Sequence, residues 1–103
     1  MINMIFEYRF VDEDSRDRSP CTMSTQVAGA LNHREDRYEE IFTDNGEDIY
    51  LCLGTGVTIR VSQTAQNDGK VWLYTHTPAN NDVAAGILRD TIKMKKLGLE
   101  AIA

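Results

Sequence analysis

The chain of 103 residues has few of the side chains on which metal sites and disulfide scaffolds depend, with only two cysteines and two histidines. Cys21 and Cys52 stand far apart, with no Cys-x-x-Cys spacing, so a structural zinc site is not expected. The first ten residues, MINMIFEYRF, interrupt their apolar run with Glu7 and Arg9 and do not match a signal peptide. We therefore expect a cytoplasmic protein whose thiols stay reduced.

Long apolar runs and a glycine-rich phosphate loop are also missing. No segment is apolar enough to cross a membrane, and the hydrophobic content of 42% is ordinary for a globular domain. No nucleophile, base and orienting group can be assembled from the sequence, so we expect no enzyme and no cofactor. Cys52 and His76 could in principle form a thiolate pair, but a buried structural cysteine is the commoner case.

The charge is acidic and uneven. Residues 1–51 hold twelve acidic and five basic residues, whereas residues 52–103 hold four acidic and six basic ones, which gives a net charge of −5. Binding to a phosphate backbone depends on lysine and arginine, so double-stranded nucleic acid is an unlikely partner. The length indicates a single domain over residues 1–103.

Strand and helix patterns divide the chain clearly at its two ends. Residues 4–11 alternate with a period of two, which predicts a strand, and the charged segment 12–20 predicts an exposed, mobile loop. A helix is expected over residues 24–35, where Val27, Ala30 and Leu31 form an apolar stripe. A second helix is expected to begin at Asn80 or Asn81 and to stop at Gly98.

Residues 37–44 fit two structures. A helix would continue the apolar stripe through Tyr38, whereas a strand would pair with the next one across Asn45-Gly46, a favoured hairpin turn. We favour the strand, although it places Glu40 on the core side. With strands at 49–53, 57–62 and 71–77, the predicted fold is α+β: an antiparallel sheet of four to five strands, in the order β-α-β-β-β-β-α, with two helices on one face.

The register of the middle strands predicts a binding surface. A three-residue GTG loop would pair Leu53 with Val57, and this register places Tyr50 and Arg60 on the face away from the helices. If Val71 and Leu73 join the aliphatic face, the alternate side chains of that strand join Tyr50 and Arg60. The expected ligand- or partner-binding set is therefore Tyr50, Arg60, Trp72, Tyr74 and His76.

The last helix carries apolar side chains around more than half of its circumference. Its flank at Leu88 and Ile92 lies away from Val83 and Ile87, so we expect Leu88 and Ile92 to form a homodimer contact. The function favoured is a non-enzymatic interaction module, an accessory or mobile-element-type protein that binds another protein and self-associates. The alternative is a binder of a nucleotide-like ligand on the aromatic sheet face.

Overall fold

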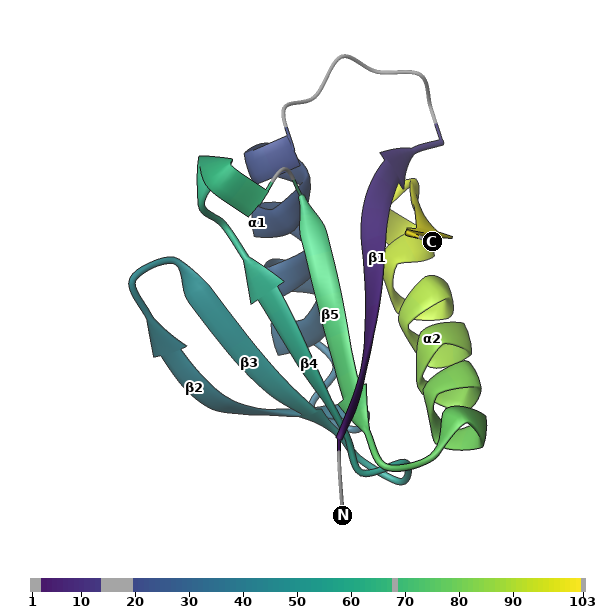
Figure 1. Cartoon of the computed structure of the whole chain (residues 1–103). Helices are drawn as coiled ribbons and strands as arrows, with labels where there is room; N and C mark the ends of the chain where they lie inside the picture. Colours follow the sequence, from purple (N-terminus) through teal and green to yellow (C-terminus); the bar gives the residue numbers. More distant parts are fainter. Residues whose placement is uncertain (1–2, 14–19, 68, 103) are drawn as a thin grey trace.

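The described strands form one antiparallel sheet of six, in the order β2-β3-β4-β5-β1-β6 (Figure 1). This computed structural model describes residues 3–13, 20–67 and 69–102. Both helices lie on the same side of the sheet in Figure 1. The elements are β1 (Met4–Asp12), α1 (Pro20–Asn32), β2 (Tyr38–Asp44), β3 (Glu47–Cys52), β4 (Val57–Ser62), β5 (Lys70–Thr75), α2 (Pro78–Ile92) and β6 (Leu97–Ala101), with short 3₁₀ turns at Ala65–Asn67 and Lys93–Lys95.

The predicted α+β class, with an antiparallel sheet and two helices, is confirmed. The sheet has six strands instead of the four to five that the sequence predicted. Helix α2 ends at Ile92, and Lys96 turns the chain with a φ of 58°. The following residues pair with β1, where Gly98 lies opposite Val11. A Cβ at Gly98 would stand 3.0 Å from Val11 Cγ2, so this glycine permits close strand contact instead of stopping the helix.

The β2–β3 hairpin confirms that residues 37–44 are mainly strand. Asn45 and Gly46 both adopt positive φ, at 52° and 80°, which matches the twist that a two-residue hairpin requires. The register shifts between Glu40 and Phe42, so Ile41 is the bulged residue. Glu40 stays exposed because β2 is an edge strand, and its carboxylate therefore remains in water despite pointing to the helix side.

The β3–β4 hairpin corrects the predicted register by one residue. Cys52 pairs with Val57, so the loop contains four residues, from Leu53 to Gly56. Gly54 and Gly56 both have positive φ, and together they let Leu53 join the loop. Tyr50 consequently pairs with Ile59 and enters the core. The side chains that the shift moves to the opposite face are Ile49 and Leu51.

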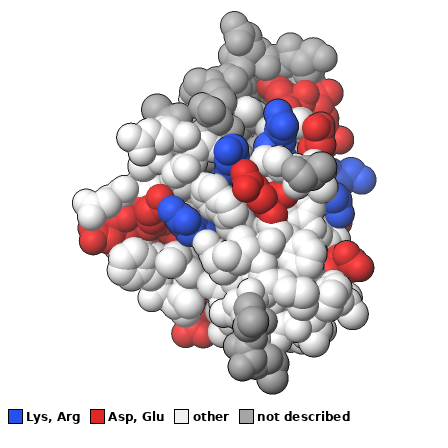
Figure 2. All heavy atoms as spheres, viewed as in Figure 1, with Lys and Arg blue, Asp and Glu red and all other residues white. Residues whose placement is uncertain are grey.

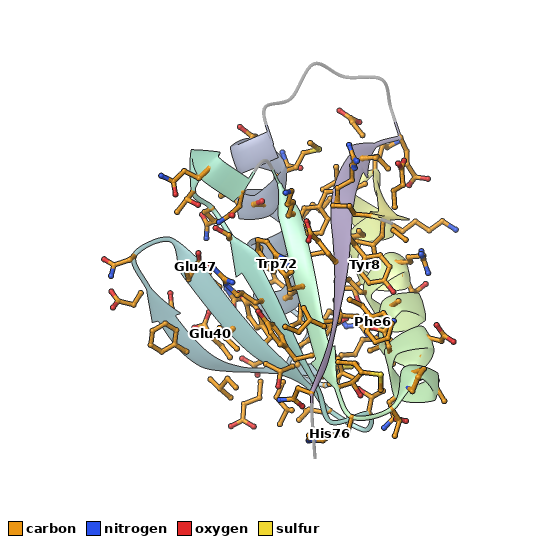
Figure 3. The ribbon with its side chains drawn as sticks, viewed as in Figure 1. Phe6, Tyr8, Glu40, Glu47, Trp72 and His76 are labelled. Carbon is orange, nitrogen blue, oxygen red and sulfur yellow. The ribbon has the colours of Figure 1, made fainter. Side chains whose placement is uncertain are left out.

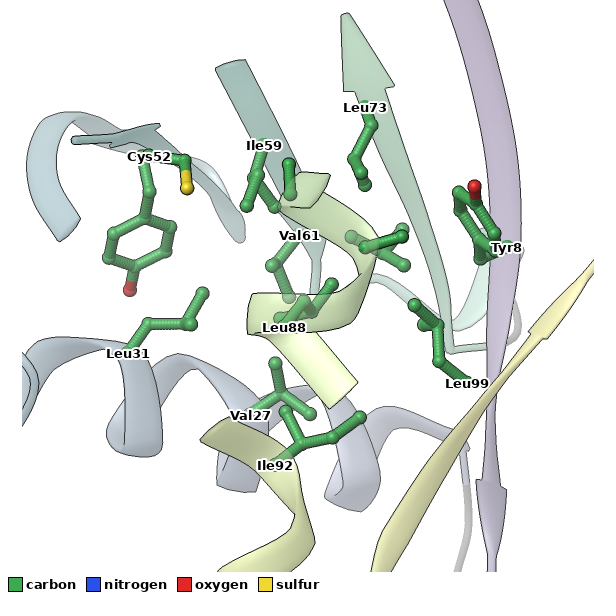
Figure 4. Packing of buried hydrophobic residues seen from close by; sticks show 14 of the residues in the cluster. Tyr8, Val27, Leu31, Cys52, Ile59, Val61, Leu73, Leu88, Ile92 and Leu99 are labelled. Atoms are coloured by element: carbon green, nitrogen blue, oxygen red, sulfur yellow. The ribbon is translucent and has the colours of Figure 1, made fainter. Parts of the chain in front are cut away.

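The core lies between the sheet and the two helices (Figure 4). Leu88 and Ile92 are both 0% exposed and belong to the same buried cluster as Val27 and Leu31 of α1. The predicted homodimer contact at Leu88 and Ile92 is therefore wrong, because the chain's own first helix covers this flank. The wide apolar arc of α2 arises from two internal neighbours, the sheet and α1.

The charged segment that follows β1 is described only at its start. Asp12 closes β1 and Glu13 forms a turn, while residues 14–19 of the predicted mobile loop lie outside the described residues. Within the described ranges, neither helix has the length and apolar character needed to cross a bilayer.

Candidate functional site

The face of the sheet opposite the helices, here called the open face, has no helical layer over it among the described residues. Its side chains stand in rows across the strands, because paired residues point to the same side. One row joins Phe42, Ile49, Arg60, Trp72 and Glu7. The next row joins Glu39, Leu51, Thr58, Tyr74 and Ile5.

Arg60 sits at the centre of the open face and is already engaged by its neighbours. Its Nε and Nη2 each donate to a carboxylate oxygen of Glu47 at 2.9 Å. Its guanidinium carbon lies 4.6 Å from the centre of the Trp72 ring. Hydrogen bonding to Glu47, and secondly to Tyr74, raises the pKa of Arg60, while Arg60 lowers the pKa of Glu47. The planar fork that could bind a phosphate is therefore occupied within the chain.

Apolar side chains lie on either side of Arg60 and Trp72 and remain partly exposed to water. Ile5 on β1 is 60% exposed and Phe42 on β2 is 49% exposed. Ile49 and Leu51 on β3 are half-buried, between β2 and the central strand β4. Uncharged residues occupy much of the lower part of the surface in Figure 2, while charged side chains lie across its middle as well as at its upper part and edges. Partly exposed apolar side chains on both sides of a central polar group are compatible with an interaction site.

Three of the predicted binding residues lie together as expected. Arg60, Trp72 and Tyr74 share the open face, with Arg60 paired to Trp72 and Thr58 paired to Tyr74. Trp72 is half-buried near the middle of the sheet, and His76 follows the end of β5 at the lower rim of Figure 3. Arg60, Trp72 and Tyr74 thus face the side that the alternation predicted, while their role in binding stays a prediction.

Tyr50 is the exception, and its predicted placement on the open face is wrong. Its side chain is 1% exposed on the helix side, and its hydroxyl donates to the Ala28 carbonyl oxygen at 3.3 Å. Burial, followed by the nearby Asp48 and Glu40 carboxylates, raises the pKa of Tyr50. Four open-face residues were missed in the sequence, namely Ile5, Phe42, Ile49 and Leu51. The apolar character of every position in 49–53 was the only signal for Ile49 and Leu51, while Ile5 alternates with the buried face of β1.

His76 lines a shallow polar pocket of about 400 Å³ at the end of the sheet. Tyr74 and Thr58 extend the open face into this pocket, and Asn80 contributes from the first turn of α2. The lining groups are hydroxyls, amides, a phenol and an imidazole. Cys52 is buried in the core while His76 is exposed, so the two do not form a thiolate pair.

A second, acidic pocket of about 570 Å³ lies on the helix side, between the end of α1 and the β2–β3 edge. Glu35 and Glu40 line it on the helix side, beside Leu53, and Glu39 lies at its border. Among the described residues, no group of three or more histidine, cysteine, aspartate or glutamate side chains could hold a metal ion. This pocket therefore offers negative charge without a metal-binding arrangement.

No protein-family model, curated protein or solved structure matches the chain, so its fold and open face are the basis for a functional assignment.

Proposed function

We propose that this protein is a non-enzymatic interaction module that binds a protein partner through the open face. The observation that carries the proposal is the set of partly exposed apolar side chains that four strands present on the open face, on both sides of Arg60 and Thr58 of β4. Ile5, Phe42, Ile49, Leu51, Trp72 and Tyr74 make up this set. Aromatic side chains of this kind are enriched in the centres of protein interfaces.

The arrangement of Arg60 and Trp72 favours a protein partner over a nucleotide-like ligand. A nucleotide base would need a free aromatic face, yet the Arg60 guanidinium occupies one side of the Trp72 ring. A phosphate would need a free cation, yet Glu47 holds Arg60 in a bidentate ion pair. Apolar side chains at Phe42 and Ile49 suit the burial of a partner's side chains better than either of these contacts.

The proposal includes a cytoplasmic, accessory role of the kind found in mobile elements. Cys52 is a buried free thiol, which fits a reducing compartment. The net charge of −5 argues against a role in coating nucleic acid.

Site-specific photo-crosslinking in cells that express the protein tests this proposal. The crosslinker p-benzoylphenylalanine replaces Phe42 on the open face in one variant and Met94 in a matched control. Met94 is 65% exposed but lies in the turn after α2, away from the open face. We expect protein adducts from position 42 that position 94 does not give. Adducts of equal yield from both positions, or from neither, would overturn the assignment of the open face.

The alternative, a nucleotide-like ligand, finds support in the polar pocket beside His76 and Tyr74. Trp72 is the only tryptophan in the chain, so its emission reports contacts at the open face directly. We expect adenine and guanine nucleotides at millimolar concentration to leave the emission unchanged, after correction for absorbance. Saturable quenching that is lost on His76→Ala would instead favour the ligand-binding function.

A further inference from the structure

We infer that the protein partner of the open face is a second copy of this chain, with the two open faces packed against each other. This inference rests on the proposed function, because it names the occupant of the same surface. The two copies are related by a two-fold axis that runs parallel to the strands and close to β4. The predicted homodimer is thereby retained, but its contact moves from Leu88 and Ile92 to the opposite side of the molecule.

The distribution of charge on the open face supports this axis. At the end of the sheet where β2 turns into β3, Asp44 pairs with Glu47 across the strands. At the same end, Lys70 of β5 pairs with Arg9 of β1. Rotation about an axis along β4 brings β3 over β5 of the second copy and β2 over β1. The acidic pair of one copy therefore faces the basic pair of the other, twice in the dimer. Glu47 and Lys70 are also ion-paired within each copy, with Arg60 and Glu7 respectively, so the attraction across the axis depends mainly on Asp44 and Arg9.

Apolar side chains show the same complementarity in the two adjoining rows. The half with β2 and β3 presents aliphatic Ile49 and Leu51, whereas the half with β5 presents Trp72 and Tyr74 in the same rows. The rotation places Ile49 opposite Trp72 and Leu51 opposite Tyr74 of the second copy. On the outer strands it places Phe42 opposite Glu7 and Ile5 opposite Glu39, so the apolar contact is confined to the four inner positions. Aligned sheets in β-sandwiches pack in this way, with side chains from the two inner faces interdigitated.

Other surfaces of the described chain offer less for such a contact. Leu88 and Ile92 are buried. On the helix side, the exposed Leu53 and Val83 line a pocket of about 390 Å³ together with Ile87, while the exposed Met94 comes from the turn after α2. In the open face, the apolar side chains come from two pairs of adjacent strands, β2–β3 and β5–β1, on either side of β4. Glu100 pairs with Arg9 at the β6 edge, outside the area of overlap.

The size of the overlap predicts a weak dimer. Five strands spaced about 4.8 Å apart, with about six residues each at about 3.3 Å per residue, cover roughly 500 Å² in projection on each copy. This area is at the small end of the range for specific interfaces. We therefore expect a monomer–dimer equilibrium with a dissociation constant of roughly micromolar order.

Charge reversal in two separate variants tests the geometry. Arg9→Asp places acidic groups against Asp44 of the second copy, and Asp44→Arg places basic groups against Arg9. Sedimentation equilibrium of each variant alone should show dimerisation weakened by at least about tenfold. An equimolar mixture should restore a heterodimer, because both contacts across the axis become attractive again. Lys93→Asp, an exposed charge reversal on the helix side, should leave dimerisation unchanged.

The outcomes separate this inference from the proposed function. Restored association in the mixture, with each variant folded by circular dichroism, supports the face-to-face dimer. A protein that stays monomeric at 100-fold above micromolar concentration, but is crosslinked from position 42 to a different protein, overturns the dimer and leaves the proposed function in place. A monomer without crosslinks from position 42 overturns both. A dimer that persists unchanged in both variants also overturns this arrangement.

Discussion

The guanidinium of Arg60 lies over the ring of Trp72, its direct neighbour across the β4–β5 pair, with 4.6 Å between the guanidinium carbon and the ring centre. Glu47 holds the other edge of the guanidinium through two hydrogen bonds. A carboxylate, a cation and an aromatic ring from three adjacent strands thus form one ordered group on the open face. Its order reduces the entropy that these side chains would lose when a partner binds.

Substitution of Trp72 should destabilise the fold less than substitution of its buried neighbour Leu73. Trp72→Ala removes a half-buried ring and its contact with Arg60, so we expect the free energy of unfolding to fall by about 1 kcal/mol. Leu73→Ala, the neighbouring residue on the buried face, should cost about 2–5 kcal/mol. Urea unfolding followed by circular dichroism measures both. A larger loss from Trp72→Ala than from Leu73→Ala would show that the ring belongs to the core.

Stability should depend on pH through the Glu47 carboxylate. Arg60 lowers the pKa of Glu47 in the folded protein below its ordinary value of 4.5, so the folded state favours the ionised carboxylate. This contribution is fully present above about pH 4.5 and is lost as the pH falls through the lower folded-state value. Because the pair is partly exposed, Glu47→Gln should cost only about 0.5–1 kcal/mol at pH 7.

Urea unfolding of wild type and Glu47→Gln at pH 7 and pH 3 measures this dependence. The difference between the two proteins should shrink at pH 3, because below pH 4.5 the unfolded chain takes up a proton on Glu47 and the contribution of the ion pair begins to be lost. Asp82→Asn, an exposed position on α2, serves as a control for general charge effects. A difference between wild type and Glu47→Gln that stays constant across this range would argue against the ion pair.

A buried hydrogen bond joins the start of α2 to β1. Asn81 is 2% exposed, and its Nδ2 donates to the Tyr8 hydroxyl at 2.8 Å. Tyr8→Phe would leave this buried amide without its acceptor, so we expect a loss of about 1–3 kcal/mol in unfolding free energy. Thermal unfolding of Tyr8→Phe, Asn81→Ala and the double variant provides a double-mutant cycle. Additive effects would show that the two side chains do not interact in solution.

Leu88 distinguishes a core position from an interface position. Leu88→Ala should lower the unfolding free energy by about 2–5 kcal/mol, because it leaves a cavity between α1, α2 and the sheet. Met94→Ala, at an exposed site, should change it by less than about 0.5 kcal/mol. The loss from Leu88→Ala should not depend on protein concentration. A loss that grows with concentration would indicate that Leu88 contributes to an intermolecular contact.

The sequence predicts the β5 face well because its side chains differ in kind. Val71 and Leu73 are aliphatic, whereas Trp72 and Tyr74 carry polar groups on large rings, so alternation assigns each set to a face. Residues 49–53 are apolar at every position, so alternation alone does not tell which of them face the helices. The facing of these residues is set by the length of the loop after Cys52. That length depends on the positive backbone φ angles of Gly54 and Gly56, which the amino-acid sequence does not specify.

A similar ambiguity affects the helix and the last strand. The apolar arc of α2 is wide enough to meet two neighbours, and its sequence does not say which flank meets the sheet. The structure places Ala84 and Ala85 in the core and leaves Val83 exposed, because small side chains permit close packing. Strand β6 is only five residues long and begins after a left-handed Lys96, so its pattern is too short to be distinguished from a helix end.

The position of β1 between β5 and β6 has a consequence for the order of folding. The earliest strand in the chain has neighbours that both come from the last third of the described sequence. During synthesis, the β2–β3–β4 meander can form from local contacts while β1 still has no partner on either edge. The sheet therefore closes around its first strand last, and a ribosome-bound chain that lacks residues 70–101 should expose β1 to chaperones.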